Sequence, residues 1–506
     1  MDTLTPDLPT APPQLDQPQM TTHSPQGISP SPWLSAYVAF SRTWSPRAYD
    51  GFHVACGLWI LSTVAARRVV LRLGKEYYTP LYIALVARSS LYSKSTTTAI
   101  ALDTLAAAGL DWLLAPDNST PRRFIRDLSL KLPVNYAALS PPQRDRAHKR
   151  LALTARRGWF YDEFGQQLAN LSREQGSLAD FRSLLRRLDD CKDSYEYAAF
   201  GHSSDVLRRP YLALLANLTP ADMQRSSRRG SSLWNDGFWA RFAFAVPPAA
   251  GYASDHTRFP DGLRAIPPAL SAPLRAWHER LGMPRLAITP TPSLGTAGAE
   301  VGEGCTAPWP GTPGTLPFSP SPSPWPGTPG TLPLSPSPTL AVEPLDPVAC
   351  TLGEGVKEAF YTYHDDLLEM AQGNNLPDLD ASYARLAEKA LRVAMLVASL
   401  ENDNHVEQVH WSLGRTIAED WRADLDALYD QMAPASGGGI PPAPEPSLEE
   451  RLISILRKHP RSTAADLARY VRGLSTQAAH EALGPLVYGG RIAAYVDGRT
   501  LRYEVI

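Results

Sequence analysis

The chain has 506 residues, of which 43% are hydrophobic and 20% charged, so it is long enough for two or three domains with a sizeable core. Its formal net charge of −2 excludes a globally basic protein, so any nucleic-acid surface must be local. The four cysteines are Cys56, Cys191, Cys305 and Cys350. They are too far apart in sequence for a zinc knuckle or a CxxC pair, which indicates reduced thiols.

The first 30 residues are polar and rich in proline, which predicts a disordered tail and is not the pattern of a secretory signal. Aromatic residues recur at helical spacing from Trp33, and we expect a helical region over residues 31–80. The most apolar run, residues 54–64, is too short to span a bilayer and predicts a buried helix. We therefore expect a cytoplasmic protein that does not contact a membrane.

Residues 81–284 alternate short apolar runs with longer amphipathic stretches, which indicates an α/β fold. The predicted strands are residues 81–86, 158–162, 211–216 and 238–246. Between the first two strands, residues 122–157 are rich in arginine and lysine.

The first strand leads into a loop that ends in Lys94-Ser95 and then into a helix. This arrangement is typical of a P-loop, in which the helix N-terminus and the lysine bind the phosphates of ATP. Ser93, Lys94, Ser95 and Thr96 are the predicted phosphate-binding residues, and Ser95 is also a predicted Mg²⁺ ligand. Ala87 and Ser93 stand where the standard motif has glycine, which puts ATP hydrolysis in question.

The second predicted strand ends in Asp162-Glu163. An acidic pair at this point predicts that Asp162 helps to hold Mg²⁺ and that Glu163 polarises the attacking water. The alternative is a strand that ends in a solvated acidic turn.

The third and fourth strands each carry one candidate. Asn217 follows an apolar strand, where an amide could orient water near the γ-phosphate, although it could also be an ordinary turn residue. Arg241 lies within the predicted strand 238–246, where a buried guanidinium needs a reason. Either a catalytic arginine or a structural ion pair would supply one. The candidate catalytic residues are therefore Lys94, Glu163, Asn217 and Arg241.

The chain then changes character. Residues 285–347 contain a near-perfect tandem repeat rich in proline and predict a disordered linker. Residues 348–434 predict a helical region that completes the core, and residues 435–446 predict a second linker.

Residues 447–506 read as three helices and a hairpin around Asp497-Gly498, a pattern that is similar to a winged helix. The predicted third helix contains no lysine or arginine, so DNA binding would depend on residues around it. The predicted contacts are Arg472, Gln477, Arg491, Arg499 and Arg502. Docking of a protein partner is the alternative.

The segments 78–86, 159–164, 215–219, 237–244 and 383–400 together resemble the DUF3987 proteins, a family of helicase/primase-like P-loop ATPases of bacteria, phages and mobile elements. The resemblance implies a RecA-like or AAA+-like core that acts in replication or mobile-element maintenance. The two replaced P-loop glycines depart from the family's usual pattern.

Three functions therefore stay open. The chain could be a helicase-like ATPase that uses ATP and Mg²⁺ on single-stranded or duplex DNA, with a homo-oligomeric ring as one arrangement. It could be a non-catalytic P-loop scaffold whose winged helix binds DNA or protein. The core could also bind single strands along residues 122–157 without translocating.

Overall fold

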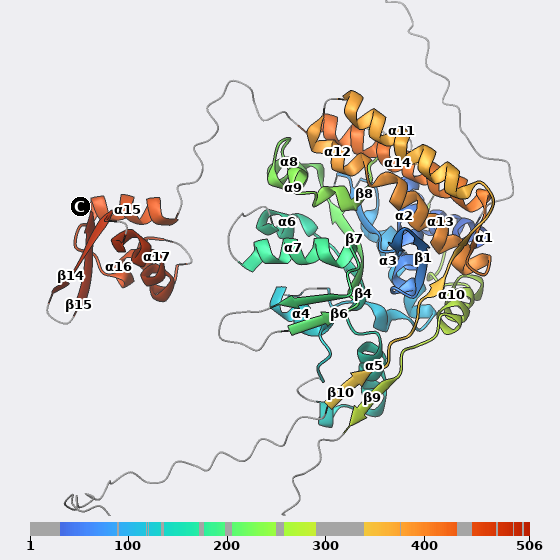
Figure 1. Cartoon of the computed structure of the whole chain (residues 1–506), viewed down its shortest axis with the longest axis horizontal. Helices are drawn as coiled ribbons and strands as arrows, with labels where there is room; N and C mark the ends of the chain where they lie inside the picture. Colours follow the sequence, from blue (N-terminus) through green and yellow to red (C-terminus); the bar gives the residue numbers. More distant parts are fainter. Residues whose placement is uncertain are drawn as a thin grey trace, which may run out of the picture. The chain divides into compact units, whose positions relative to one another are not determined.

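The computed structural model divides into two compact units, Met1–Met432 and Ala433–Ile506, which are described separately. The residues that the structure describes are 31–88, 91–117, 119, 121–132, 136–171, 177–197, 205–248, 258–289, 339–374, 376–432, 448–471, 474–488, 490–497 and 500–505 (Figure 1). The predicted tail 1–30, the repeat within 290–338 and the predicted linker 435–446 lie outside them.

A four-stranded parallel sheet forms the centre of the larger unit, in the order β4-β7-β3-β8. Its strands are β3 (Tyr82–Val86), β4 (Arg156–Tyr161), β7 (Tyr211–Leu218) and β8 (Phe242–Ala245). Ile83 is in register with Leu215 on one side and with Ala243 on the other. The predicted mixed α/β fold with a parallel sheet is confirmed at this level.

The fourth strand is shorter than predicted. Gly237 has a φ of 73°, and the next residues form a 3₁₀ turn, Trp239–Arg241, so the strand begins only at Phe242. The predicted strand 238–246 is therefore wrong at its start, and Arg241 precedes the strand instead of lying within it.

Helix α2 (Asp50–Ala65) is buried along most of its length because it lies between the sheet and other helices. The Trp59 indole Nε1–H donates to the carbonyl of Ala213 in β7 at 3.1 Å. The helix also approaches β4 closely, since a Cβ atom on Gly158 would lie 2.4 Å from Oγ1 of Thr63. The prediction of a buried apolar helix is confirmed.

The prediction of a helical region over 31–80 is only partly correct. Helix α1 (Pro32–Trp44) and α2 are present, but α2 ends at Ala65 and two strands follow. These strands are β1 (Val69–Leu73) and β2 (Lys75–Tyr77), which pair with each other. The β-branched Val69 and Val70 favour an extended chain there.

Helices cover both faces of the central sheet. In Figure 1, α6 (Phe164–Leu171) and α7 (Ser177–Asp189) lie on one side, and α2 lies on the other with α13 (Leu386–Glu401). The other helices of residues 81–284 are α3 (Lys94–Ala107), α4 (Pro121–Leu128), α5 (Pro141–Ala152), α8 (Pro220–Ser226), α9 (Ser232–Asn235) and α10 (Pro268–Arg280), with 3₁₀ turns at Asp111–Leu113 and Tyr136–Ala138.

Short strand pairs complete the larger unit. One is local, β5 (Ser194–Tyr197) with β6 (Asp205–Arg208). The others join distant parts of the chain: β9 (Leu286–Thr289) with β10 (Thr339–Val342), β1 with β11 (Val348–Ala349), and β12 (Thr351–Leu352) with β13 (His405–Val406). The β9–β10 pair corrects the predicted linker 285–347, because both of its ends are hydrogen-bonded strands.

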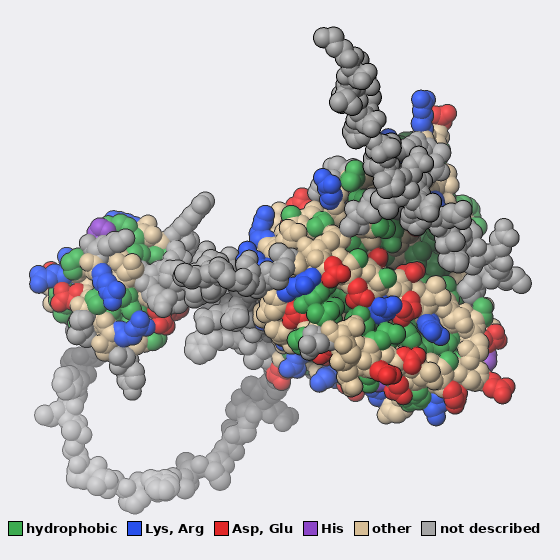
Figure 2. Space-filling view, turned by 90° about the horizontal axis from the view of Figure 1, so that it is seen from above, with side chains coloured by type: hydrophobic (Ala, Val, Ile, Leu, Met, Phe, Trp, Pro, Cys, Tyr) green, Lys and Arg blue, Asp and Glu red, His purple; other side chains and the backbone are tan. Residues whose placement is uncertain are grey.

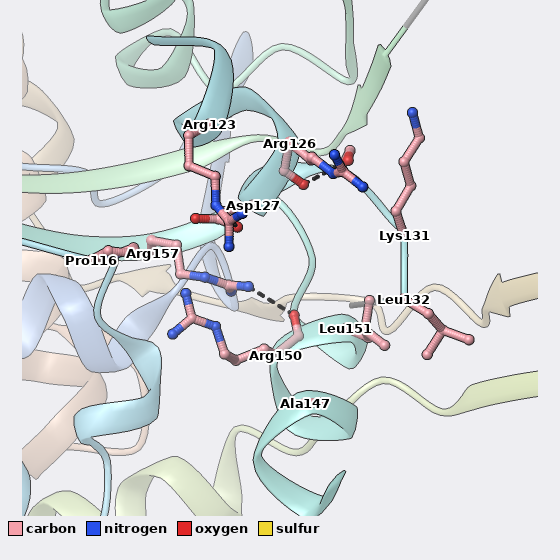
Figure 3. Close-up of a pocket in the computed structure, with 11 residues that line it drawn as sticks. Pro116, Arg123, Arg126, Asp127, Lys131, Leu132, Ala147, Arg150, Leu151 and Arg157 are labelled. Carbon is pink, nitrogen blue, oxygen red and sulfur yellow. Dashed lines mark hydrogen bonds and ion pairs between the residues drawn. The ribbon is translucent and has the colours of Figure 1, made fainter. Parts of the chain in front are cut away.

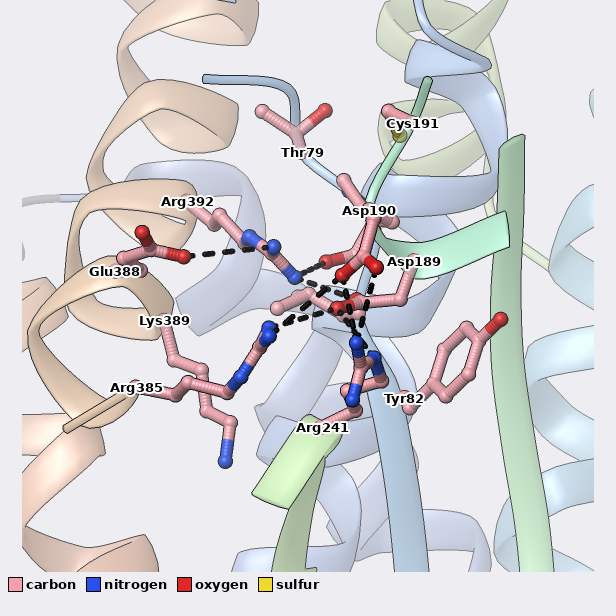
Figure 4. Close-up of polar contacts among 12 residues, drawn as sticks. Thr79, Tyr82, Asp189, Asp190, Cys191, Arg241, Arg385, Glu388, Lys389 and Arg392 are labelled. Atoms are coloured by element: carbon pink, nitrogen blue, oxygen red, sulfur yellow. Dashed lines mark hydrogen bonds and ion pairs between the residues drawn. The ribbon is translucent and has the colours of Figure 1, made fainter. Parts of the chain in front are cut away.

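The helical region after the linker packs against the same core. It consists of α11 (Val356–Asn374), α12 (Pro377–Tyr383), α13 and α14 (Gln408–Gln431). Figure 4 shows side chains of α13 converging with Asp189 of α7, where Arg392 Nη1 lies 2.7 Å from the carboxylate. Lys389 donates to the carbonyl of Phe242 at 2.5 Å. Residues 348–432 therefore belong to the larger unit.

No helix in the described part of the chain is both long and apolar enough to cross a membrane. On the face shown in Figure 2, acidic and basic side chains are interspersed over the larger unit. This mixture agrees with the small net charge of the chain.

The smaller unit contains three helices and a hairpin around its own apolar core, which includes Leu452, Leu467 and Leu483. The elements are α15 (Leu448–Lys458), α16 (Ala464–Tyr470), α17 (Thr476–Tyr488), β14 (Ile492–Asp497) and β15 (Thr500–Val505). The strands pair antiparallel from Ile492–Val505 to Asp497–Thr500. Its assignment as a winged helix stays a prediction.

Candidate functional site

The N-terminus of α3 lies directly after the loop that follows β3. Ser93 is its N-cap residue and has φ 45° and ψ 35°, in the left-handed region. This conformation costs a non-glycine residue about 1–2 kcal/mol. Ser93 thus adopts, with strain, the backbone conformation for which the standard motif uses glycine, and the chain enters the helix at Lys94.

The Lys94 side chain turns back over the ends of two strands. Its Nζ donates to the carbonyl of Ala87 at 2.8 Å and to the carbonyl of Leu218. Burial lowers the pKa of Lys94 to about 8, against the opposing effect of the Asp222 and Asp162 carboxylates. The ammonium is therefore held at the carboxyl edge of the sheet, where it is partly buried and close to carboxylates.

Asp162 and Asn217 meet at the same edge because β4 and β7 are parallel neighbours, with Tyr161 in register with Ala216. Asn217 Nδ2 donates to Oδ1 of Asp162 at 2.9 Å. Asn217 Oδ1 is buried and has no hydrogen-bond partner among the described residues. The amide thus fixes the carboxylate and keeps one buried acceptor unused.

Glu163 follows in a left-handed conformation with φ 53°. Its backbone N–H donates to Oδ1 of Asp162 at 3.2 Å, and its carboxylate accepts from Gln166 Nε2 at 3.0 Å. Both acidic side chains are exposed to solvent. The turn therefore presents two carboxylates at the edge of the sheet, with Glu163 oriented by the first turn of α6.

These groups line one cavity of about 610 Å³. The cavity contains every predicted phosphate-binding and metal-binding residue of the core, and all the predicted catalytic residues except Arg241. Its lining residues are Arg88, Ser93, Lys94, Ser95, Thr96, Asp162, Glu163, Gly165, Gln166, Asn217, Leu218, Thr219 and Asp222. The predicted residues are thus brought together, while their chemical roles stay predictions.

Six lining residues were not among the site candidates from the sequence: Arg88, Gly165, Gln166, Leu218, Thr219 and Asp222. Asp222 accepts from the backbone N–H of Thr219 at 3.0 Å and from its hydroxyl at 2.7 Å, which forms a capping box at the start of α8. A Cβ atom on Gly165 would lie 2.2 Å from the Asp222 carboxyl carbon, so a side chain at this position would displace the Asp222 carboxylate. The Thr-x-x-Asp pattern after β7 was the available signal for Asp222.

An anion fits this cavity because backbone N–H groups at the start of α3 and the Lys94 ammonium face it. Within the described residues, no group of three or more His, Cys, Asp or Glu side chains could hold a metal ion by itself. Mg²⁺ that arrives with a phosphate ligand needs only one or two protein ligands. Ser95 and Asp162 both line the cavity, and their side-chain oxygens are of the right chemistry for such ligands.

Arg241 does not belong to this site. It precedes β8, and Phe242 is in register with Tyr82 at the start of β3, so Arg241 lies at the amino edge of the sheet. Its guanidinium pairs with Asp190 at 2.9 Å and lies 3.8 Å from Asp189 (Figure 4). The predicted catalytic role for Arg241 is wrong within this chain, and the structural ion pair is the correct reading.

The predicted DNA contacts of the smaller unit have mixed outcomes. Arg472 and Arg499 lie outside the described residues. Arg491 lies 3.6 Å from Glu449, and Arg502 lies 3.1 Å from Asp497. Gln477 is exposed near the start of α17 and donates to Glu481 at 3.4 Å.

No family model matches the sequence, and a search of curated proteins finds no relative. Among solved structures, the chain is similar to a full-length MCM homologue from Methanopyrus kandleri, with a TM-score of 0.35 and 14% identity. The alignment covers 79% of this chain and 63% of that one, which is less than two thirds of its length. A similarity this low identifies neither a family nor an activity.

Proposed function

We propose that this chain is a P-loop ATPase-like protein of helicase or primase type, which binds ATP with Mg²⁺ at the Lys94 cavity and acts on or near DNA. One observation carries the proposal. Lys94, Asp162 and Asn217 lie at the ends of three neighbouring parallel strands and line a single cavity beside a helix N-terminus. Such a cavity suits a polyphosphate because the backbone N–H groups and the ammonium complement its charge.

The roles follow from the chemistry of each group. The start of α3 and Lys94 would hold the β- and γ-phosphates, and Ser95 and Asp162 would hold Mg²⁺. The metal ion would supply neutralisation of the phosphate charge. Glu163, exposed and oriented by Gln166, would accept a proton from the attacking water, while Asn217 fixes Asp162.

Hydrolysis is the second step of this proposal and needs its own test. Phosphate release should be measured with and without single-stranded DNA for the wild type, Glu163→Gln and Lys94→Ala. We expect Glu163→Gln to bind ATP but to lose turnover at least a hundredfold. Lys94→Ala should lose both binding and turnover. If the wild type neither binds nor hydrolyses ATP, with or without DNA, the proposal that the chain is an ATPase is refuted.

A second candidate is a non-catalytic P-loop scaffold or DNA-binding regulator. Two observations favour it. Lys94 Nζ already donates to two backbone carbonyls, and Ser93 adopts its left-handed conformation with strain. This candidate predicts DNA binding that depends on salt and is indifferent to nucleotide. ATP-dependent tryptophan fluorescence that disappears in Lys94→Ala would exclude it.

The smaller unit is proposed to be a winged-helix module. Its hairpin exposes Val496 and Leu501, which are 69% and 38% exposed, and the described residues of α17 include no lysine or arginine. These features suit a protein partner, whereas Gln477 and Arg491 suit DNA. Membership of the DUF3987 proteins, a role in mobile-element maintenance and assembly into a homo-oligomer are parts of the same proposal, and they rest on the sequence pattern.

A further inference from the structure

Strand β4 begins with two consecutive buried arginines at the edge of the sheet opposite Lys94. Arg156 is 6% exposed and Arg157 is 2% exposed. Successive side chains of a strand point to opposite faces, and these two residues line two different cavities. A buried guanidinium is costly unless an anion accompanies it, so the charges around both residues need explanation.

Within the described residues, Arg157 makes hydrogen bonds only to carbonyl groups. Nη1 donates to Leu153 at 2.8 Å and to Arg156 at 2.7 Å, and Nη2 donates to Arg150 at 3.0 Å. Its Nε–H has no partner, and no carboxylate of the described residues lies within ion-pair distance. Burial lowers the pKa of Arg157 well below its usual value, and the neighbouring Arg150 lowers it further, against the opposing effect of the Asp127 carboxylate.

The cavity beside Arg157 has a volume of about 380 Å³ and an excess of positive charge. Figure 3 shows the Arg150 and Arg157 guanidinium groups lying side by side, with the side chains of α4 above them. Among the described residues that line the cavity, Asp127 is the only acidic one, and it is paired with Arg123 at 3.3 Å. The cationic lining residues are Arg123, Arg126, Lys131, Arg150 and Arg157.

The cavity beside Arg156 repeats this pattern. It has a volume of about 860 Å³ and is lined by Arg156, Arg208 and Arg209. Asp193, the one acidic residue among its described lining residues, is paired with Arg67 at 3.0 Å. Arg156 Nε also has no partner in the described part of the chain, and burial, followed by Arg67 and Arg209, lowers the pKa of Arg156 to about 10.

The two cavities are neighbours because consecutive residues line one and then the other. Ser129, Leu151 and Arg157 line the smaller cavity, and the adjacent Leu130, Ala152 and Arg156 line the larger one. We propose that these cavities form one phosphate-binding surface, in which the phosphodiester groups of a nucleic-acid strand are the counter-ions of the unpaired arginines. This inference rests on the proposed action on DNA and gives it a location, at the amino end of β4.

A strand fits this surface better than one free phosphate. Two adjacent cavities offer sites for more than one phosphate group, and Arg126 and Lys131 extend the charge to the exposed rim.

The first test uses the full-length chain and a fluorescein-labelled oligothymidylate, followed by anisotropy without nucleotide. Charge reversal at the rim, Arg126→Glu with Lys131→Glu, should weaken binding at least tenfold. It should also reduce the slope of log affinity against log salt by about 1.4, because two phosphate contacts are lost. The matched control is Lys357→Glu with Arg415→Glu, two exposed cations of α11 and α14 with the same change in charge. Equal losses of affinity in the rim variant and the control variant would overturn the assignment of this surface.

A second variant separates binding from a structural role. Arg150→Gln removes the cation beside Arg157, so it should raise the melting temperature of the free protein, or leave it unchanged, while weakening strand binding at least fivefold. An arginine needed only for folding would instead lower the melting temperature. A lowered melting temperature with unchanged affinity would overturn the inference.

The source of the phosphate is tested by competition. Inorganic tripolyphosphate should displace the strand only at concentrations far above those of an unlabelled oligonucleotide with the same number of phosphates. Binding of tripolyphosphate without any binding of strand would overturn the nucleic acid as the ligand. Failure of this surface is distinguishable from failure of the proposed function. If the wild type binds the strand and the rim variant binds it equally, only the surface fails, whereas a wild type that binds no DNA removes both.

Discussion

Asn217 donates a hydrogen bond from Nδ2 to Oδ1 of Asp162 across 2.9 Å, which joins the ends of β7 and β4. The bond leaves the amide oxygen of Asn217 buried and without a partner in the described residues. A buried acceptor without a donor is unfavourable by about 1–3 kcal/mol, so the position is one where a bound ligand or water could restore the balance.

Replacement of this amide should therefore affect ligand binding more than folding. We expect Asn217→Ala to reduce the affinity for Mg·ATP about tenfold, because Asp162 loses its orienting donor, a loss near 1.4 kcal/mol. The free energy of unfolding should change by only about 1 kcal/mol, since one donor and one unsatisfied acceptor are removed together. Calorimetric titration and urea unfolding measure the two quantities. Asn235→Ala, an exposed asparagine in α9, is the control and should change neither.

Ser93 provides a test of the missing glycine. Its φ of 45° is strained for serine, so Ser93→Gly should raise the free energy of unfolding by up to about 1 kcal/mol and tighten nucleotide binding several-fold. The comparison is Ser231→Gly. Ser231 is an N-cap serine with φ −73°, so this change should lower the free energy of unfolding by a few tenths of a kcal/mol or more. Equal destabilisation by both changes would show that the left-handed conformation is not under strain.

The pKa of Lys94 makes nucleotide binding dependent on pH. In the free protein, burial lowers the pKa of Lys94 to about 8. A bound phosphate would raise this pKa, because an adjacent negative charge favours the protonated amine. Binding should therefore take up a proton between about pH 8 and pH 10, and affinity should fall as the pH rises through this range. Calorimetry in buffers of different ionisation enthalpy measures the uptake.

The matched variant is Lys94→Arg, which stays protonated at these pH values. It should show no uptake at pH 9 if it binds nucleotide at all. Proton uptake of the same size in both proteins would assign the effect to another group.

The buried charge cluster around Asp189 predicts a large effect on stability. Arg392 lies 2.7 Å from this carboxylate, and Arg385 and Arg241 lie at 3.5 Å and 3.8 Å (Figure 4). Burial raises the pKa of Asp189, but Arg392 and Arg385 outweigh burial and the net pKa is lowered. Asp189→Asn should lower the free energy of unfolding by about 3–5 kcal/mol, because it leaves buried guanidinium groups without an anion.

The neighbouring Asp190 is the control for this cluster. It is partly exposed and pairs with Arg241 at 2.9 Å, so Asp190→Asn should lower the free energy of unfolding by about 1 kcal/mol. Urea unfolding of the two variants compares them directly. If Asp190→Asn proves as damaging as Asp189→Asn, burial of the carboxylate is not the determining factor.

Local pattern was enough to predict much of the candidate site. The strand–loop–helix around Lys94 and the acidic turn at Asp162 are encoded within short segments, and parallel strands place their carboxyl ends at one edge. Arg241 was misplaced because the strand start depends on a 3₁₀ turn after Gly237, which hydrophobicity does not reveal. That error moved the residue from one edge of the sheet to the other.

The remaining features depend on contacts between residues far apart in the chain. Asp189 and Arg392 are separated by 203 positions and meet only when α13 packs on the core. The β9–β10 pair likewise joins Leu286 to Val342 across the proline-rich repeat. The sequence pattern of either segment does not indicate pairing with a distant strand, so the ends of the linker were predicted to be disordered.

The most direct test of the central claim is equilibrium binding of Mg·ATP to the full-length chain, compared with Lys94→Ala and with the exposed control Lys149→Ala of α5. The proposed site predicts saturable binding by the wild type and by Lys149→Ala, and a loss of at least a hundredfold in Lys94→Ala, about 2.7 kcal/mol. Binding of equal strength in all three proteins, or no binding by the wild type, would contradict the assignment of the Lys94 cavity.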